Sequence, residues 1–257
     1  MYTPGFPSVG GMLIAAFLNT FQDSIVHEGA KFHSLEHFQK LVNAFTKVQK
    51  LQNDPRLISD YLIHQFGINA PVRPDNKGKK WGGTTHFNVI DQDGMTVCLT
   101  TSLGEGSGYF IPGTDMQLNN MLGEEALMPN GFHNWNPDER LQSMMSPTII
   151  VNKSGRTKMG IGSGGAGRIP YAMCQVIINH LFFGLPLEKA VESARMHMSK
   201  GKIEIESGFD IDAELFDNVN QWDTNSLYFG GTNLIYRFAN SFRGVADQRR
   251  YGSVIHS

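Results

Sequence analysis

The stretch from residue 84 to residue 101 constrains the fold most strongly. Thr85, Phe87 and Val89 alternate with His86, Asn88 and Ile90 over residues 85–90. Asp93-Gly94 is a strong turn signal, and residues 95–101 again have the composition of a strand. Alternation with a period of two places one set on each face of a strand, and Asp-Gly favours the tight turn of a hairpin. The sequence therefore predicts an antiparallel β-hairpin that begins near Thr84.

A second hairpin and several helices are predicted around it. Residues 148–151 and 158–161 flank Ser154-Gly155 and lead directly into the glycine-rich segment 162–167. Residues 202–206 alternate like a strand. Apolar residues recur at helical spacing or run continuously in five other stretches, which are 12–18, 34–50, 58–66, 170–183 and 186–198. The order of helices and strands indicates layered α/β or α+β packing.

Composition excludes several classes of protein. The 257 residues carry 22 basic and 24 acidic side chains, so no large field of one sign is available and nucleic acid is not an expected partner. Two cysteines, Cys98 and Cys174, cannot form a disulfide framework or a four-thiolate zinc site. We see no export signal, and the apolar run at 12–18 is too short to span a bilayer.

The segment Gly162-x-Gly164-x-x-Gly167 lies after a predicted strand and before a predicted helix. A dinucleotide-binding turn occupies this context, but the acidic residue that it needs about 20 positions later is missing, because Glu188 and Glu192 fall in a helical pattern. Two readings remain open: a glycine-rich turn without a ligand, or backbone N–H groups that stabilise an oxyanion.

A change in composition precedes the first hairpin. Residues 69–83 are rich in proline, glycine and lysine and are typical of an exposed linker, which ends in Gly82-Gly83. Thr84 follows, so a hydroxyl stands at the boundary between the linker and a strand. Threonine is common in strands, and the Thr84-Thr85 pair by itself indicates packing more than catalysis.

An ordered set of motifs changes this interpretation. They resemble the γ-glutamyltransferase (glutathione hydrolase) family of N-terminal-nucleophile hydrolases from about Pro4 to Gly252. The matching segments are Thr84-Thr-His-Phe with Asp91-x-Asp93-Gly94, Gly106-Ser-Gly108, Leu118-Asn-Asn120, Ser146-Pro-Thr148 and Gly162-Ser-Gly-Gly-x-x-Arg168-Ile169. Further likenesses lie at 4–11, 227–231 and 246–250.

The resemblance implies an α+β fold of the αββα sandwich type, with two stacked sheets between helical layers. It divides the chain into a large-subunit-like region at 1–83 and a small-subunit-like catalytic region at 84–257, together forming one domain. Thr84 would attack the Gly83 carbonyl, release itself as a new N-terminus, and then act as the nucleophile on γ-glutamyl amides such as glutathione, with water or an amino-acid or peptide acceptor completing the reaction. No metal or organic cofactor is implied.

Other site residues follow from the resemblance. Ser102 would orient the nucleophile, and the N–H groups of Gly165 and Ala166 would form the oxyanion hole. Ala166 replaces a glycine that is common in the family, which carries no cost if its φ is negative. Asn120, Glu124 and Ser143 fall on substrate-binding positions, with Glu124 placed to hold the substrate α-amino group.

Three departures keep other functions open. Met121 and Met144 replace polar residues, which would suit a related acylase with a more apolar substrate. Family precursors are about twice as long, and the arginine that pairs with the substrate α-carboxylate has no counterpart here. The chain would then be a non-catalytic remnant, or half of a split enzyme that binds a complementary segment. Family members are commonly exported or membrane-anchored, but this sequence leaves its compartment unknown.

Overall fold

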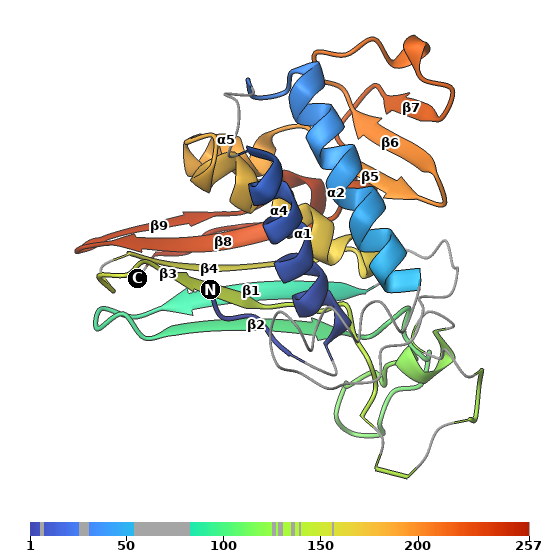
Figure 1. Cartoon of the computed structure of the whole chain (residues 1–257). Coiled ribbons are helices and arrows are strands. Elements are labelled where there is room, and N and C mark those ends of the chain that lie inside the picture. The colour runs from blue at the N-terminus through green and yellow to red at the C-terminus, as the bar shows by residue number, and fades with distance from the viewer. Residues whose placement is uncertain are drawn as a thin grey trace.

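A four-stranded antiparallel sheet in the order β3-β4-β8-β9 forms the centre of the molecule (Figure 1). Its strands are β3 Thr148–Val151, β4 Thr157–Gly164, β8 Gly231–Phe238 and β9 Ser241–Val245. The computed structural model describes residues 1–5, 8–25, 31–53, 83–124, 127, 131–134, 137–138, 140–155 and 157–256.

Helices of the described residues make a layer on one face of this sheet (Figure 1). They are α1 Val9–Ile25, α2 Leu35–Asn53, α4 Ile169–Leu181 and α5 Leu187–Glu192. Helix α4 packs on β4 and β8, and α1 packs between α4 and α2. Phe17, Phe45 and Tyr171 meet edge-on or stacked in this layer, where their burial supplies much of the hydrophobic stabilisation.

The predicted hairpin covers the other face of the central sheet. Strands β1 Thr84–Ile90 and β2 Thr96–Ser102 pair antiparallel, with Gly94 at a φ of +85° in the turn. The hairpin lies against β4 and β8. Hydrogen bonds tie the two layers together, since Asn88 donates to the Asn233 carbonyl and Asn233 donates to the His86 carbonyl, each at 3.1 Å.

Alternate glycines of β4 face alternate residues of β1, and we call Gly160, Gly162 and Gly164 the glycine stripe. A methyl group on Gly162 would strike the His86 ring, and one on Gly164 would lie 2.5 Å from the Thr84 carbonyl oxygen. Side chains at these positions would push the layers apart. The glycine stripe therefore fixes how closely the first residue of β1 approaches the end of β4.

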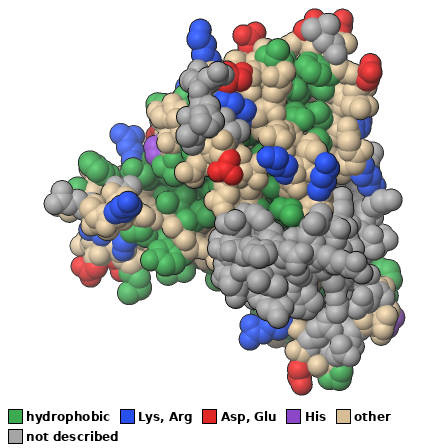
Figure 2. All heavy atoms as spheres, in the orientation of Figure 1, with side chains coloured by type: hydrophobic (Ala, Val, Ile, Leu, Met, Phe, Trp, Pro, Cys, Tyr) green, Lys and Arg blue, Asp and Glu red, His purple; other side chains and the backbone are tan. Residues whose placement is uncertain are grey.

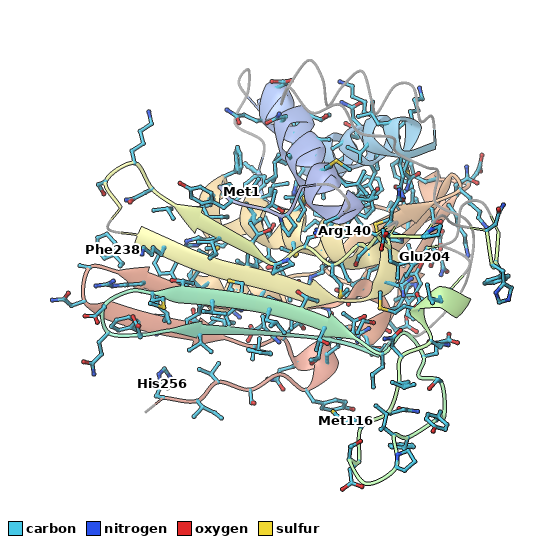
Figure 3. All side chains as sticks on the ribbon, turned by 90° about the horizontal axis from the view of Figure 1, so that it is seen from below. Met1, Met116, Arg140, Glu204, Phe238 and His256 are labelled. Atoms are coloured by element: carbon cyan, nitrogen blue, oxygen red, sulfur yellow. The ribbon has the colours of Figure 1, made fainter. Side chains whose placement is uncertain are left out.

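The outer face of the hairpin is exposed and apolar. Phe87 is paired with Leu99 and Val89 with Val97, and all four side chains are 42–54% exposed. Viewed from below, no helix among the described residues lies over β1 and β2, and the segment that ends near His256 runs beside them (Figure 3). The described residues thus form three layers of the expected αββα sandwich: helices, central sheet and hairpin.

A third sheet contains β5 Met196–Ser199, β6 Lys202–Glu206 and β7 Val219–Trp222. The predicted helix 186–198 is therefore wrong beyond Glu192, where α5 ends. Side chains from distant segments hold the backbone extended there: Glu206 accepts from the Arg195 N–H and Gln175 accepts from the Met196 N–H, both at 2.9 Å. Tertiary hydrogen bonds override the helical spacing.

The remaining elements agree with the sequence or extend it. Both hairpins and the strand at 202–206 are confirmed, α1 and α2 run beyond their predicted ends, and Gly184 follows α4 at a φ of +69°. The predicted helix 58–66 and linker residues 69–82 lie outside the described residues, and the division at residue 83 stays a prediction. Short 3₁₀ turns complete the fold: η1 Met121–Gly123, η3 Ala166–Arg168, η4 Ala213–Leu215, η5 Leu227–Phe229 and η6 Gln248–Arg250.

The surface carries charges of both signs. On the side shown in Figure 2, Lys and Arg side chains are interspersed with Asp and Glu, with hydrophobic side chains between them. No described helix combines the length and hydrophobicity that crossing a bilayer requires. Nor do the described residues bring three potential metal-ligating side chains together.

Candidate functional site

Thr84 and Ser102 meet at the open end of the hairpin. They are the first residue of β1 and the last of β2, they pair across the ladder, and their hydroxyl oxygens lie 3.0 Å apart. Ser102 Oγ also accepts the Gly104 N–H at 3.0 Å. Because that bond occupies one lone pair only, the Ser102 hydroxyl proton remains able to point at Thr84 Oγ1. The two hydroxyl groups are therefore within hydrogen-bond reach of each other, as an orienting role for Ser102 requires.

The peptide that precedes Thr84 is held by the same strand ends. The Gly83 carbonyl oxygen accepts the Leu103 N–H at 3.0 Å, and the Gly83 N–H donates to the Gly104 carbonyl. A carbonyl oxygen that already accepts an N–H is prepared for the negative charge that builds up during nucleophilic attack. The bond between Gly83 and Thr84 is therefore ordered next to a hydroxyl.

Asn120 and Glu124 converge over Gly104. A methyl group on Gly104 would strike both Asn120 Oδ1 and Glu124 Oε1, and its φ of +63° also favours glycine. Asn120 accepts the Glu105 N–H at 2.7 Å, and its own N–H donates to the Leu103 carbonyl at 3.1 Å. The structure thus brings these two predicted substrate-binding residues to the segment that holds Ser102.

Gly165 and Ala166 turn the chain between β4 and α4. Gly165 has a φ of +136° and Ala166 a φ of +52°. The condition set for Ala166, a negative φ, is not met, so the alanine carries a left-handed strain of about 1 kcal/mol that glycine would avoid. Gly164, which precedes this turn, lies against Thr84. The N–H groups of Gly165 and Ala166 are therefore at the same end of the sheets as Thr84.

Ser143 lies apart from these residues. Its carbonyl accepts the Gly10 N–H at 3.3 Å and its hydroxyl accepts the Met145 N–H at 3.0 Å. It also bridges to Ser8, just before α1. The described contacts therefore place Ser143 against the start of α1 and give it no partner from the Thr84 group.

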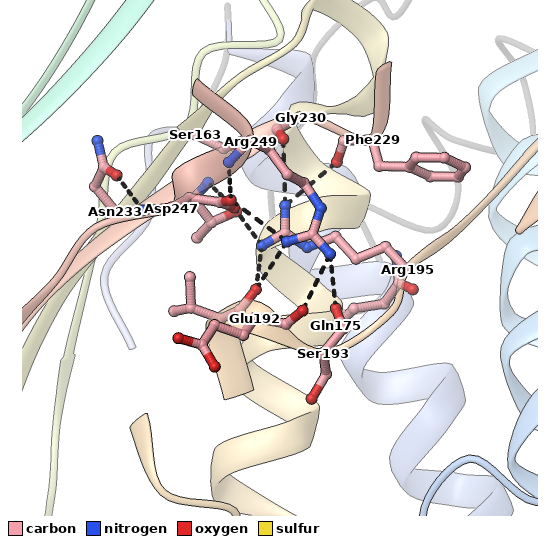
Figure 4. A network of polar contacts seen from close by, with 12 residues as sticks. Ser163, Gln175, Glu192, Ser193, Arg195, Phe229, Gly230, Asn233, Asp247 and Arg249 are labelled. Carbon is pink, nitrogen blue, oxygen red and sulfur yellow. Dashed lines mark hydrogen bonds and ion pairs between the residues drawn. The ribbon is translucent and has the colours of Figure 1, made fainter. Parts of the chain in front are cut away.

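A buried network of ion pairs supports the turn at Gly165 and Ala166 (Figure 4). Arg195 donates to Asp247 at 2.6 Å and to the Gly230 carbonyl at 3.3 Å, while Arg249 binds Glu206 at 2.5 Å. Burial raises the pKa of Asp247, but the charges of Arg195 and Arg249 outweigh this effect and the pKa is lowered. Gly230 in turn lies against Gly165, where an added methyl group would come within 3.0 Å of its Cα.

His86, two residues after Thr84 on β1, is a neutral structural link between the strands of the hairpin. Its ring nitrogens bind Thr100 Oγ1 at 2.8 Å and Asn88 Oδ1 at 2.9 Å. Burial lowers its pKa, so both bonds fit an uncharged imidazole that accepts at Nδ1 and donates at Nε2. The histidine keeps β1 in place without carrying charge.

Sequence reasoning missed the surroundings of Thr84 that come from distant segments. Arg250 donates to the Thr84 carbonyl at 3.5 Å, and the guanidinium of Arg168 lies 4.7 Å from the centre of the Tyr228 ring. Both arginines stand inside motifs that the sequence singled out, at 162–169 and 246–250. No spacing rule indicated that Arg250 contacts Thr84 or that Arg168 packs on Tyr228.

The fold belongs to the class of N-terminal-nucleophile hydrolases. A structure titled gamma-glutamyltranspeptidase from Pseudomonas nitroreducens superposes with a TM-score of 0.56 at 25% identity, covering 67% of this chain and 99% of that one. The match to cephalosporin acylase from Bacillus halodurans covers 95% of this chain and 49% of that one, with a TM-score of 0.65. Because the identity is 20%, this match shows the fold alone. The expected α+β class is confirmed.

The chain belongs to the gamma-glutamyltranspeptidase family, whose model matches residues 30–257. "Glutathione hydrolase proenzyme" of Bacillus subtilis is 29% identical over 84% of this chain, and "Glutathione hydrolase 5 proenzyme" of Mus musculus is 34% identical over 98%. The matches take up 37% and 50% of those two relatives, so the chain spans half of their length or less.

Proposed function

We propose that this chain is an autoprocessed N-terminal-threonine hydrolase or transferase of γ-glutamyl amides, with Thr84 as its nucleophile. The observation that carries the proposal is the 3.0 Å contact between Thr84 Oγ1 and Ser102 Oγ directly after the Gly83 carbonyl. Family membership supports the reaction class.

Processing comes first. Thr84 Oγ1 attacks the Gly83 carbonyl carbon, the C–N bond breaks, and the acyl group moves from nitrogen to oxygen as an ester. The Leu103 N–H that binds the Gly83 oxygen at 3.0 Å stabilises the tetrahedral oxyanion. Water then hydrolyses the ester, leaving a Gly83 carboxylate and a Thr84 with a free α-amine. The products carry the atoms of one added water.

Turnover uses the freed amine. A threonine hydroxyl is a weak nucleophile, and an α-amine with an ordinary pKa of 7.7–8.0 can accept its proton near neutral pH. Thr84 Oγ1 attacks the γ-carbonyl of the substrate, the amine of the leaving group departs with a proton, and the acyl-enzyme passes its acyl group to water or to an amino-acid acceptor. The N–H groups of Gly165 and Ala166 stabilise the oxyanion.

Substrate recognition is assigned to Asn120 and Glu124. Their oxygens converge over Gly104, where they suit a protonated α-amino group such as that of glutathione. Ser143 has a weaker case, because its hydroxyl and carbonyl contact Met145 and Gly10. Met121 and Met144 next to these positions would favour a more apolar acyl group in a related acylase.

Intact mass measured after incubation at neutral pH tests the proposal. Cleavage after Gly83 separates the first 83 residues from the remaining 174. We expect Thr84→Ala to abolish cleavage, while Thr85→Ala, which alters an exposed position on the outer face of β1, leaves it detectable. A wild-type chain that stays uncut, or equal loss in both variants, would remove Thr84 as the nucleophile.

A second candidate is a chain that acts only with a complementary segment. The exposed pairs Phe87–Leu99 and Val89–Val97 form an apolar sheet face directly beside the site, and the relatives extend well beyond the matched region. Contiguous apolar surface of this kind commonly marks an interface. The occupant would be a segment with an apolar face, supplied by a polypeptide that corresponds to the unmatched part of the relatives.

Co-expression separates the two candidates. The chain would be produced alone and together with the unmatched part of the Bacillus subtilis relative, and processing would be followed by mass in both samples. Cleavage of the chain alone supports the first candidate. Cleavage that requires the second polypeptide, and that is lost in Val89→Lys, supports the second.

A further inference from the structure

Two arginines lie near Thr84 or in the turn that follows β4. Arg250 Nη1 donates to the Thr84 carbonyl at 3.5 Å and would lie 3.3 Å from a methyl group on Gly164. The Arg168 N–H donates to the Gly165 carbonyl at 3.0 Å, so its backbone closes the turn that follows Gly164. Arg250 therefore contacts Thr84 directly, and the backbone of Arg168 belongs to the turn that begins beside Thr84.

Neither arginine has a carboxylate partner within the described residues. This contrasts with Arg195 and Arg249, which bind Asp247 and Glu206 at 2.6 and 2.5 Å. The Nε–H groups of Arg168 and Arg250 are buried and donate to no described acceptor. Asp247 attracts Arg250, but its oxygens are committed to Arg195, the Thr232 N–H and Arg249.

The surroundings of Arg168 and Arg250 supply too little negative charge to balance the two guanidinium groups. Burial lowers the pKa of each, and the charge of Arg250 lowers that of Arg168 further. A partly buried cation without an anion is costly to keep, because it has lost water and gained no opposite charge. Such groups at a reactive centre mark a place where a ligand supplies the missing charge.

The packing also pre-organises the two guanidinium groups. The face of Arg168 rests on the Tyr228 ring, which is itself stacked on Trp222 with ring centres 5.1 Å apart. A ring contact engages the face of a guanidinium and leaves the in-plane N–H groups available. The stem of Arg250 packs on Gly231, where an added methyl group would lie 2.5 Å from its Cδ. Both groups are held with little freedom left to lose on binding.

We propose that Arg168 and Arg250 form a carboxylate-binding site beside Thr84. In-plane guanidinium donors match the two oxygens of a carboxylate. The carboxylate is either that of the γ-glutamyl half or the C-terminal one of the leaving group or acceptor. The identity of the carboxylate ligand as part of a substrate rests on the proposed function. The ability of the two arginines to bind a carboxylate does not, because both cations are in place before any chemistry.

Direct binding tests the site without requiring turnover. Isothermal titration would use the full-length Thr84→Ala chain, which keeps both arginines and forms no acyl-enzyme. The probes are γ-glutamyl anilide, with its carboxylate on the acyl half, glycylglycine, with its carboxylate on the acceptor, and glycylglycine amide, which has none. We expect one carboxylate probe to bind, to weaken with added salt, and to exceed the amide at least tenfold.

Variants then assign the site. Arg168→Gln and Arg250→Gln in the Thr84→Ala background should each lower the association constant about tenfold or more, with partial recovery in the lysine variants. Arg243→Gln is the matched control, because Arg243 is 71% exposed on β9. Equal affinity in the folded glutamine variants, or no carboxylate binding at all, overturns the site. Arginine-dependent binding in a wild-type chain that never cleaves would reject the nucleophile while retaining the site.

Discussion

Gly164 lies so close to Thr84 that a methyl group on its Cα would be 2.5 Å from the Thr84 carbonyl oxygen. The atom in the way belongs to the backbone, so it cannot rotate aside as a side chain could. This single contact couples the end of β4 to the position of the candidate nucleophile.

We expect Gly164→Ala to stop processing at Gly83 while the chain remains folded. Overpacking of this kind costs about 1–3 kcal/mol and would move Thr84 away from Ser102. Intact mass follows the cleavage and urea unfolding follows the stability. Gly5→Ala is the control, since an added methyl group there meets nothing within 4 Å. Normal cleavage in Gly164→Ala would show that the contact does not position Thr84.

Ser102→Ala should slow processing about tenfold or more. The substitution removes the hydroxyl 3.0 Å from Thr84 Oγ1 and also leaves the Gly104 N–H without its acceptor, at a stability cost of about 1 kcal/mol. Ser107→Ala removes an exposed hydroxyl bonded to the Leu118 carbonyl and should leave the rate unchanged. Ser102→Thr, which retains the hydroxyl, should restore part of the rate. A rate in Ser102→Ala equal to wild type would rule out an orienting role.

Stability should decline as the pH falls below 6.5. Burial lowers the pKa of His37 and His197 to about 3, with the charge of His33 and that of Arg168 as the next causes. Below pH 6.5 the unfolded chain binds protons at these positions and the folded chain does not. The free energy of unfolding is therefore fully retained above pH 6.5 and lost as pH falls toward 3, by up to about 1.4 kcal/mol per pH unit for each histidine.

Urea unfolding at intervals between pH 7.5 and 5.5 measures this slope. The window stays about one pH unit or more above the ordinary pKa values of Asp and Glu, so the histidines dominate it. His197→Gln should flatten the profile, whereas replacement of the exposed His256 should not change it. A flat wild-type profile would mean that the buried histidines are charged in the folded chain.

Asp247→Asn should destabilise the chain by about 3–5 kcal/mol. The substitution removes the carboxylate charge that pairs with Arg195 and Arg249, so two buried cations lose part of their compensating negative charge. Glu188→Gln breaks an exposed contact with Arg243 at 3.6 Å and should cost less than about 1 kcal/mol. Chemical denaturation of both variants gives the comparison. A loss of similar size in the two would show that the network contributes no more than a surface pair.

Local patterns in the sequence were sufficient for the hairpins. Alternation over 85–90 and the Asp93-Gly94 turn specify β1 and β2, because both signals act between neighbouring residues. The helical spacing after Pro186 failed at Arg195 and Met196 for the opposite reason. Their backbone groups are captured by Glu206 and Gln175, which lie 11 and 21 residues away.

The candidate site divides in the same way. Thr84, Ser102, Asn120 and Glu124 stand in motifs that could be read in order along the chain, and the structure places them around one segment. The positive φ of Ala166 and the position of Arg250 depend on packing between β4, η3 and η6, which no residue spacing encodes. The contacts of Ser143 depend likewise on where α1 begins.

The glycine stripe limits how the position of the candidate nucleophile could change during evolution. Each glycine of the stripe packs against one residue of β1: Gly164 against Thr84, Gly162 against His86 and Gly160 against Asn88. Because side chains alternate between the two faces of a strand, a shift of β1 along β4 keeps the same face inward only if it is two residues long. A one-residue insertion in the β1–β2 turn could be absorbed locally, but one inside β1 would replace His86 with an outward-facing neighbour. The position of Thr84 along β4 is thus set by three residues that lack side chains, and the Ser102 hydroxyl that contacts it sets only its orientation.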